Sequence, residues 1–85
     1  MIILEKDVTM AHLDNEIALL NIKNGKYFSL NETGARIWEL LQVSVDQEQL
    51  ISSMLKEYSV EEIKLRADIV QLLEKLKEAE LIRIV

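Results

Sequence analysis

The sequence has no cysteine and no proline, and only two glycines among its 85 residues. Without cysteine, the chain has no disulfide, no catalytic thiolate and no cysteine-ligated zinc or iron–sulfur site. Two isolated glycines, Gly25 and Gly34, do not make a phosphate-binding loop. With 49% hydrophobic and 29% charged residues, the composition is that of a folded protein. We therefore expect one domain, residues 1–85, with a single modest core.

Basic residues and long apolar runs are also scarce. Fifteen acidic residues against ten basic ones give a net charge of −5, and no basic stripe offsets this field. We therefore expect neither nucleic acid nor a membrane surface as a partner. No apolar run approaches the roughly 20 residues that cross a bilayer. Met1–Leu4 is followed at once by charged residues, unlike a signal peptide, and we expect a cytoplasmic protein.

Residues that often serve in catalysis lack the neighbours that catalysis requires. His12 is the only histidine, and no acid–base partner accompanies it in a recognisable motif. The serines have no nucleophile-elbow context, and no metal-ligand spacing appears. We therefore expect no enzymatic activity, no catalytic residue, no metal and no cofactor.

The first third of the chain has the pattern of an antiparallel meander. Val8–Leu13 and Glu16–Ile22 are rich in strand-forming residues and are separated by Asp14-Asn15, which tolerates turn geometry. Asn24-Gly25 predicts a type I′ hairpin turn, and Lys26–Leu30 would form the third strand.

Three helices are predicted to follow this meander. Asn31 is the expected N-cap of a helix over about Glu32–Gln42, in which Trp38 anchors the core. Its apolar positions share one face: Ala35, Ile37, Trp38, Leu40 and Leu41.

The second and third helices carry their own start signals. For the second, these are Asp46 as N-cap, Gln49 as capping-box partner and a hydrophobic staple between Val45 and Leu50. For the third, they are Ser59, Glu62 and a staple between Tyr58 and Ile63, with the helix running to about Glu80. Leu81–Val85 would form a short strand or an extended tail. The fold class is thus α+β, a three-stranded antiparallel sheet followed by three helices.

The third helix has more apolar surface than one interface requires. One stripe has the spacing of a core seam: Leu65, Ile69, Leu72, Leu76 and Ala79. Ile63, Ala67 and Val70 lie on a separate sector, and Leu73 lies between the two sectors. A second apolar side is either buried as well or offered to a partner, and we favour a partner. An extended peptide that pairs with the free edge of the third strand would fit beside such a helix.

Several short motifs resemble the PqqD-like family, whose members recognise precursor peptides in the biosynthesis of ribosomally made, post-translationally modified peptides. The motif residues are Leu20, Gly25, Tyr27-Phe28, Leu30-Asn31, Thr33-Gly34, Ile37-Trp38, Leu40-Leu41, Tyr58, Asp68-Ile69, Leu72-Leu73 and Leu76. The resemblance implies a winged helix-turn-helix-like fold that binds a leader peptide as a strand added to the third strand, against the third helix. Carried onto this sequence, the implied peptide-binding residues are Lys26, Tyr27, Phe28, Ser29, Leu30, Ile63, Arg66, Ala67, Val70 and Leu73. Arg66 and Asp68 are candidates for contacts with charged leader groups.

Within the family, one feature bears on the pathway. Many members carry an Asp-Gly pair after the first helix, where this chain has Gln42-Val43-Ser44-Val45. This difference weakens an assignment to the branch that makes pyrroloquinoline quinone and leaves other branches open. A free-standing form of 85 residues is similar to the discrete leader-binding subunit of lasso-peptide systems, which works beside a leader peptidase and a cyclase, and we expect that branch. The alternatives are a peptide carrier for a radical enzyme in pyrroloquinoline quinone biosynthesis, a winged-helix DNA-binding module and an oligomerisation module.

Overall fold

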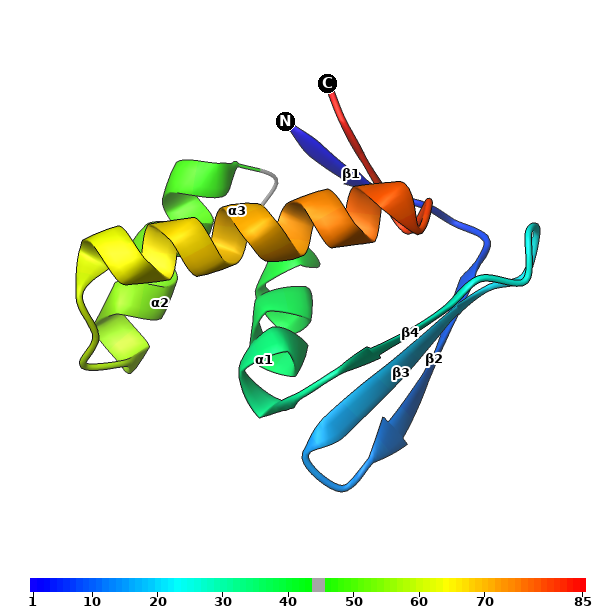
Figure 1. Cartoon of the computed structure of the whole chain (residues 1–85), viewed down its shortest axis with the longest axis horizontal. Helices are drawn as coiled ribbons and strands as arrows, with labels where there is room; N and C mark the ends of the chain where they lie inside the picture. The colour runs from blue at the N-terminus through cyan, green and yellow to red at the C-terminus, as the bar shows by residue number, and fades with distance from the viewer. Residues whose placement is uncertain (44–45) are drawn as a thin grey trace.

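A computed structural model describes residues 1–43 and 46–85 (Figure 1). Its elements in chain order are β1 (Ile2–Leu4), β2 (Val8–Leu13), β3 (Glu16–Asn21), β4 (Tyr27–Leu30), α1 (Glu32–Leu41), α2 (Gln47–Glu57), α3 (Glu62–Glu78) and β5 (Ile82–Ile84). Strands β2, β3 and β4 form one antiparallel sheet in that order, and the three helices follow it. The predicted α+β class and the order of its main elements are confirmed.

The sheet is held in register by a buried central strand. Leu19 of β3 lies between Met10 of β2 and Phe28 of β4, and its side chain is fully buried. Because side chains alternate across a strand, Ile17 and Leu19 face the core together. The turn between β2 and β3 has two residues, as predicted, and Asp14 takes the positive φ of 55° that this tight connection needs.

The turn between β3 and β4 differs from the predicted type I′ turn. Only Gly25, at φ 76°, has the positive φ that both central positions of that turn require, and Asn24 does not. The Asn21 N–H donates to the Lys26 carbonyl, so four residues, 22–25, form the loop. Asn21 explains this longer loop, because its side-chain oxygen accepts from the N–H groups of Lys23 and Asn24.

The predicted N-caps of the first two helices are confirmed. The Asn31 side chain accepts from the Gly34 N–H at 2.9 Å, and Asp46 accepts from the Glu48 N–H at 3.1 Å. Trp38 is buried in the core, as predicted. Val45, the predicted staple partner of Leu50, lies outside the described residues.

The start of α3 was predicted wrongly. The helix begins at Glu62 after Glu61, which makes no side-chain capping hydrogen bond, and Ser59 is not its N-cap. Ile63, the predicted staple partner of Tyr58, is 84% exposed, so no staple stabilises an earlier start.

The two ends of the chain pair with each other, which the sequence analysis did not predict for Ile2–Leu4. Strand β1 pairs antiparallel with β5, and the termini lie side by side near the end of α3 (Figure 1). Glu80 takes a positive φ of 58°, and the Leu81 N–H bonds back to the Leu76 carbonyl, which turns the chain out of the helix. The predicted terminal strand therefore exists, and its partner is β1 instead of the main sheet.

One core joins the sheet and all three helices. The predicted seam of α3 is confirmed, since Leu65, Ile69 and Leu76 are buried. They pack in the same cluster as Leu19 of β3 and Trp38 of α1. The longest described helix, α3, has 17 residues, and no helix in the described ranges is long and apolar enough to span a membrane.

Candidate peptide-binding site

One edge of the main sheet is open. Strand β4 pairs with β3 on one side, and no strand within residues 1–43 and 46–85 pairs with its other side. The C-terminal strand, β5, pairs with β1 and does not cover this edge. The free edge that the sequence analysis predicted for the third strand of the meander is therefore confirmed.

The register identifies which backbone groups this edge presents. The Asn21 N–H bonds to the Lys26 carbonyl, so these two residues form a hydrogen-bonded pair. Such pairs alternate along an antiparallel ladder, which makes Phe28 and Leu30 the residues that bond to β3. The N–H and C=O groups of Tyr27 and Ser29 consequently point away from β3. An added strand would pair with these two residues.

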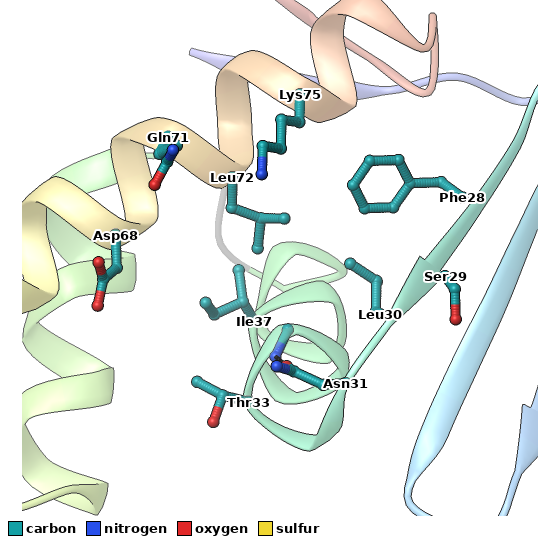
Figure 2. A pocket seen from close by; sticks show the side chains of 11 residues that line it. Phe28, Ser29, Leu30, Asn31, Thr33, Ile37, Asp68, Gln71, Leu72 and Lys75 are labelled. Atoms are coloured by element: carbon teal, nitrogen blue, oxygen red, sulfur yellow. Dashed lines mark hydrogen bonds between the residues drawn. The ribbon is translucent and has the colours of Figure 1, made fainter.

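A cleft of about 440 Å³ lies beside the open edge, between β4, the start of α1 and the middle of α3. In Figure 2, Phe28 and Leu30 point from the strand toward Leu72 of α3 and Ile37 of α1, whereas Ser29 points away from the helices. These four apolar side chains form the floor and walls of the cleft. The arrangement suits an extended segment whose alternate side chains enter the space between sheet and helix.

Gly34 allows the strand to approach the start of α1 closely. A Cβ atom at this position would lie 3.2 Å from Leu30 Cδ2, tighter than an ordinary contact. The glycine lines the cleft together with Thr33 and Asn31. The absence of a side chain here keeps Leu30 against the helix and leaves room in the cleft.

The two ends of the cleft carry opposite charges. Asp68 borders it beside Thr33, and Lys75 borders it beside Phe28 (Figure 2). Asp68 forms one exposed ion pair, with Lys64 at 3.7 Å. Lys75 forms no ion pair in the described part of the chain, and its side chain extends toward the cleft. The cleft is therefore acidic at one end and basic at the other.

Arg66 has partners of its own, away from this cleft. Its guanidinium binds Glu48 at 2.6 Å and Glu62 at 2.9 Å. The hydrogen bonds that Arg66 donates to these two carboxylates raise its pKa above the ordinary value. The charge of this arginine is thus already compensated within the protein.

The structure separates the predicted site residues into two groups. Phe28, Ser29 and Leu30 line the cleft, and Tyr27 contributes its backbone to the open edge. The Lys26 ammonium instead contacts the Glu78 carbonyl at 3.1 Å, at the end of α3. Of the predicted α3 residues, Ile63, Arg66, Ala67 and Val70 line a shallow surface that shares Gln71 with the cleft. Leu73 is buried in the same core cluster as Leu30 of β4. None of these five residues lines the cleft itself.

The α3 residues that do face β4 are Asp68, Gln71, Leu72 and Lys75. Asp68 was predicted as a candidate contact and Leu72 as part of the core seam, whereas Lys75 had no predicted role. Asp68, Leu72 and Lys75 have the spacing i, i+4, i+7 of one helix face, which is the signal that identifies this wall. Asn31, the N-cap of α1, and Thr33 and Ile37 of α1 also line the cleft and were not predicted to do so.

Two further features of the described residues concern catalysis and metal binding. His12 is exposed on β2 and borders a polar hollow with Glu32 and Arg36. No group of three histidine, aspartate or glutamate side chains in residues 1–43 and 46–85 is arranged to hold a metal ion.

The fold and cleft define a small winged-helix-like domain of the α+β class, with an open strand edge beside a helix. Residues 16–82 match the family model described as coenzyme PQQ synthesis protein D (PqqD). The chain belongs to this PqqD family. A comparison with curated proteins found no match.

Two solved structures are similar to this chain over nearly its whole length. One, described as TbiB1 in complex with the TbiA(beta) leader peptide, has a TM-score of 0.87 and 33% sequence identity, and the match covers 96% of this chain and 95% of that one. The other, described as lasso peptide synthetase B1 complexed with the leader peptide, has a TM-score of 0.84 and 28% identity, and the match covers 98% of each chain. Both relatives are thus peptide complexes of the same fold.

Proposed function

We propose that this protein binds the leader segment of a ribosomally made precursor peptide, without catalysing a reaction, in lasso-peptide biosynthesis. The observation that carries the proposal is the open edge of β4, where the backbone groups of Tyr27 and Ser29 face a cleft against α3. The two leader-peptide complexes of similar fold support it. The leader would add to β4 as an antiparallel strand, because the existing sheet is antiparallel and such pairs are slightly more stable.

Backbone pairing and buried side chains would both contribute to binding. The outward N–H and C=O groups of Tyr27 and Ser29 would fix the direction and register of the peptide, and the cleft would take its alternate side chains.

The pathway context forms part of the same proposal. The bound leader would hold the precursor for a leader peptidase and a cyclase, in the cytoplasm where the precursor is translated. In the pyrroloquinoline quinone alternative, the same module would present its peptide to a radical enzyme. The similar structure described as lasso peptide synthetase B1 favours the lasso-type pathway.

DNA binding through α3 is disfavoured by its ion pairs. Arg66 is bound by Glu48 and Glu62, and Lys64 lies 3.7 Å from Asp68. A helix that contacts phosphates needs cations free to face them, and of the four basic residues on α3 only Lys75 and Lys77 form no ion pair within the described ranges. Weak retention on heparin at low salt would agree with this argument.

The proposal is tested by titrating isotope-labelled protein with synthetic candidate leader peptides and following the amide chemical shifts. We expect the largest shifts at Tyr27, Ser29 and the cleft-facing residues of α3. Shifts confined to the β2 edge, or no shifts at millimolar peptide, would contradict leader binding at β4. Sedimentation at two protein concentrations distinguishes a second copy pairing with the same edge.

A further inference from the structure

We infer that the cleft reads the order of charges along the leader: a basic side chain toward the N-terminal end of the bound segment, an apolar side chain in the middle and an acidic one toward the C-terminal end. The inference rests on the proposed function and deepens it. It assigns specificity to Asp68 and Lys75, the charged residues at the two ends of the cleft.

The direction of the peptide follows from how β4 and α3 run. The start of β4 lies near the end of α3, because the Lys26 ammonium contacts the Glu78 carbonyl at 3.1 Å and Asn21 contacts the Glu80 carbonyl at 2.7 Å. A strand antiparallel to β4 therefore runs in the same general direction as α3. Its earlier residues pass Asp68 and its later residues pass Lys75.

The spacing of the two charges matches a short stretch of strand. Asp68 and Lys75 are seven residues apart on a helix, a rise of about 10.5 Å. Cleft-facing residues i and i+4 of a strand are about 13 Å apart. The flexible lysine side chain can span the difference of about 2.5 Å. Residue i+2 of the peptide then lies over the apolar wall made by Leu72 and Ile37.

The charges are also available to a ligand. Lys75 has no ion pair in the described ranges and extends toward the cleft in Figure 2. Asp68 has only its exposed contact with Lys64, both side chains being more than half exposed. An i, i+4 pair of this kind stabilises a helix only slightly, so a peptide cation competes with it readily.

The test uses a displayed library of twelve-residue randomised segments, selected on the full chain and on the double variant D68K/K75D. Selection on the natural chain is expected to enrich a basic residue four positions before an acidic one, with an apolar residue midway. The double variant is expected to enrich the reverse order. Thermal unfolding of both proteins establishes that the exposed substitutions leave the fold intact.

Two synthetic peptides then measure the preference for one charge order. They have the same composition and the same selected flanking sequence, and they carry Lys-Thr-Leu-Thr-Glu or Glu-Thr-Leu-Thr-Lys. We expect about a 3- to 30-fold preference for the first order on the natural chain, reversed on D68K/K75D and reduced by high salt.

The outcomes separate the inference from the proposed function. Selected peptides that shift the β4 amides but show no charge order, or keep the same order on the double variant, would overturn the inference and leave leader binding in place. If no peptide is enriched on either protein, the result would count against both the inference and the proposed function.

Discussion

The side-chain amide of Asn21, at the end of β3, donates a hydrogen bond of 2.7 Å to the backbone carbonyl of Glu80, just beyond α3. Asn21 is the buried polar residue of the described core, at 4% exposure. Its oxygen accepts from two loop N–H groups at the same time. One side chain therefore fixes the loop before β4 to the end of α3, and so helps to set the distance across the cleft.

Replacing Asn21 with alanine removes these three hydrogen bonds, so the Glu80 carbonyl and the N–H groups of Lys23 and Asn24 lose this partner. We expect Asn21→Ala to lower the free energy of unfolding by about 1–3 kcal/mol, measured by urea denaturation. Asn15→Ala, in the exposed turn between β2 and β3, is the matched control and should change stability by less than about 0.5 kcal/mol. Equal effects of the two substitutions would show that the Asn21 contact is not a structural anchor.

Peptide binding at the cleft wall of α3 and binding at its shallow surface lead to opposite predictions for substitutions on this helix. The sequence analysis predicted contacts at Val70, whereas the cleft places Leu72 opposite β4. We expect Leu72→Ala to weaken leader binding by about 1–2 kcal/mol, or 5- to 30-fold, because an apolar contact with the peptide is lost. Val70→Ala, on the shallow surface, should leave the affinity nearly unchanged.

Calorimetric titration with the leader peptide measures both affinities, and thermal unfolding checks that both variants fold. A larger loss of affinity for Val70→Ala than for Leu72→Ala would show that the peptide binds to the face of α3 that was predicted from the sequence.

Short-range patterns predicted most of this fold, and a long-range contact explains why β1 was missed. The three strands of the meander and the caps Asn31 and Asp46 depend on neighbours a few residues away. Strand β1 depends on pairing with β5 at the other end of the chain, and its three residues carry no turn signal that predicts this.

The candidate site likewise combines a feature that follows from the local sequence with one that depends on long-range packing. The open edge followed from the order of the strands, because the last strand of a meander has one neighbour. The side of α3 that faces this edge depends on how the helix is rotated and packed, which contacts such as Asn21 with Glu80 determine. Periodicity distinguished two apolar sectors on α3 but not which of them lies against β4. Leu72 belongs both to the seam and to the cleft, since it is only half-buried.

Acid should weaken the link between α1 and α2. Arg36 donates hydrogen bonds of 2.8 and 2.6 Å to Glu57 and holds the pKa of that carboxyl below its ordinary value of 4.5. A carboxyl whose pKa is lower in the folded state stabilises the fold above its unfolded pKa, and this contribution is lost as the pH falls through the folded pKa. We therefore expect part of the loss of stability below about pH 4.5 to disappear in Glu57→Gln.

Urea denaturation at several pH values measures this dependence. Glu74→Gln, an exposed substitution on α3, controls for the loss of one acidic group. The same slope of stability against pH in the natural chain and in Glu57→Gln would show that this ion pair does not contribute to acid sensitivity.

Backbone pairing at β4 predicts an alternating pattern in the peptide. Only Tyr27 and Ser29 present N–H and C=O groups to the open edge, so only every second residue of a bound strand bonds to the protein. Methylating the backbone nitrogen at each leader position in turn should lower affinity by about 2- to 10-fold at those positions, the equivalent of one hydrogen bond. The positions between them, whose N–H groups face solvent, are the internal control. A loss that follows side-chain size and not this period of two would mean that the leader binds in the cleft without joining the sheet.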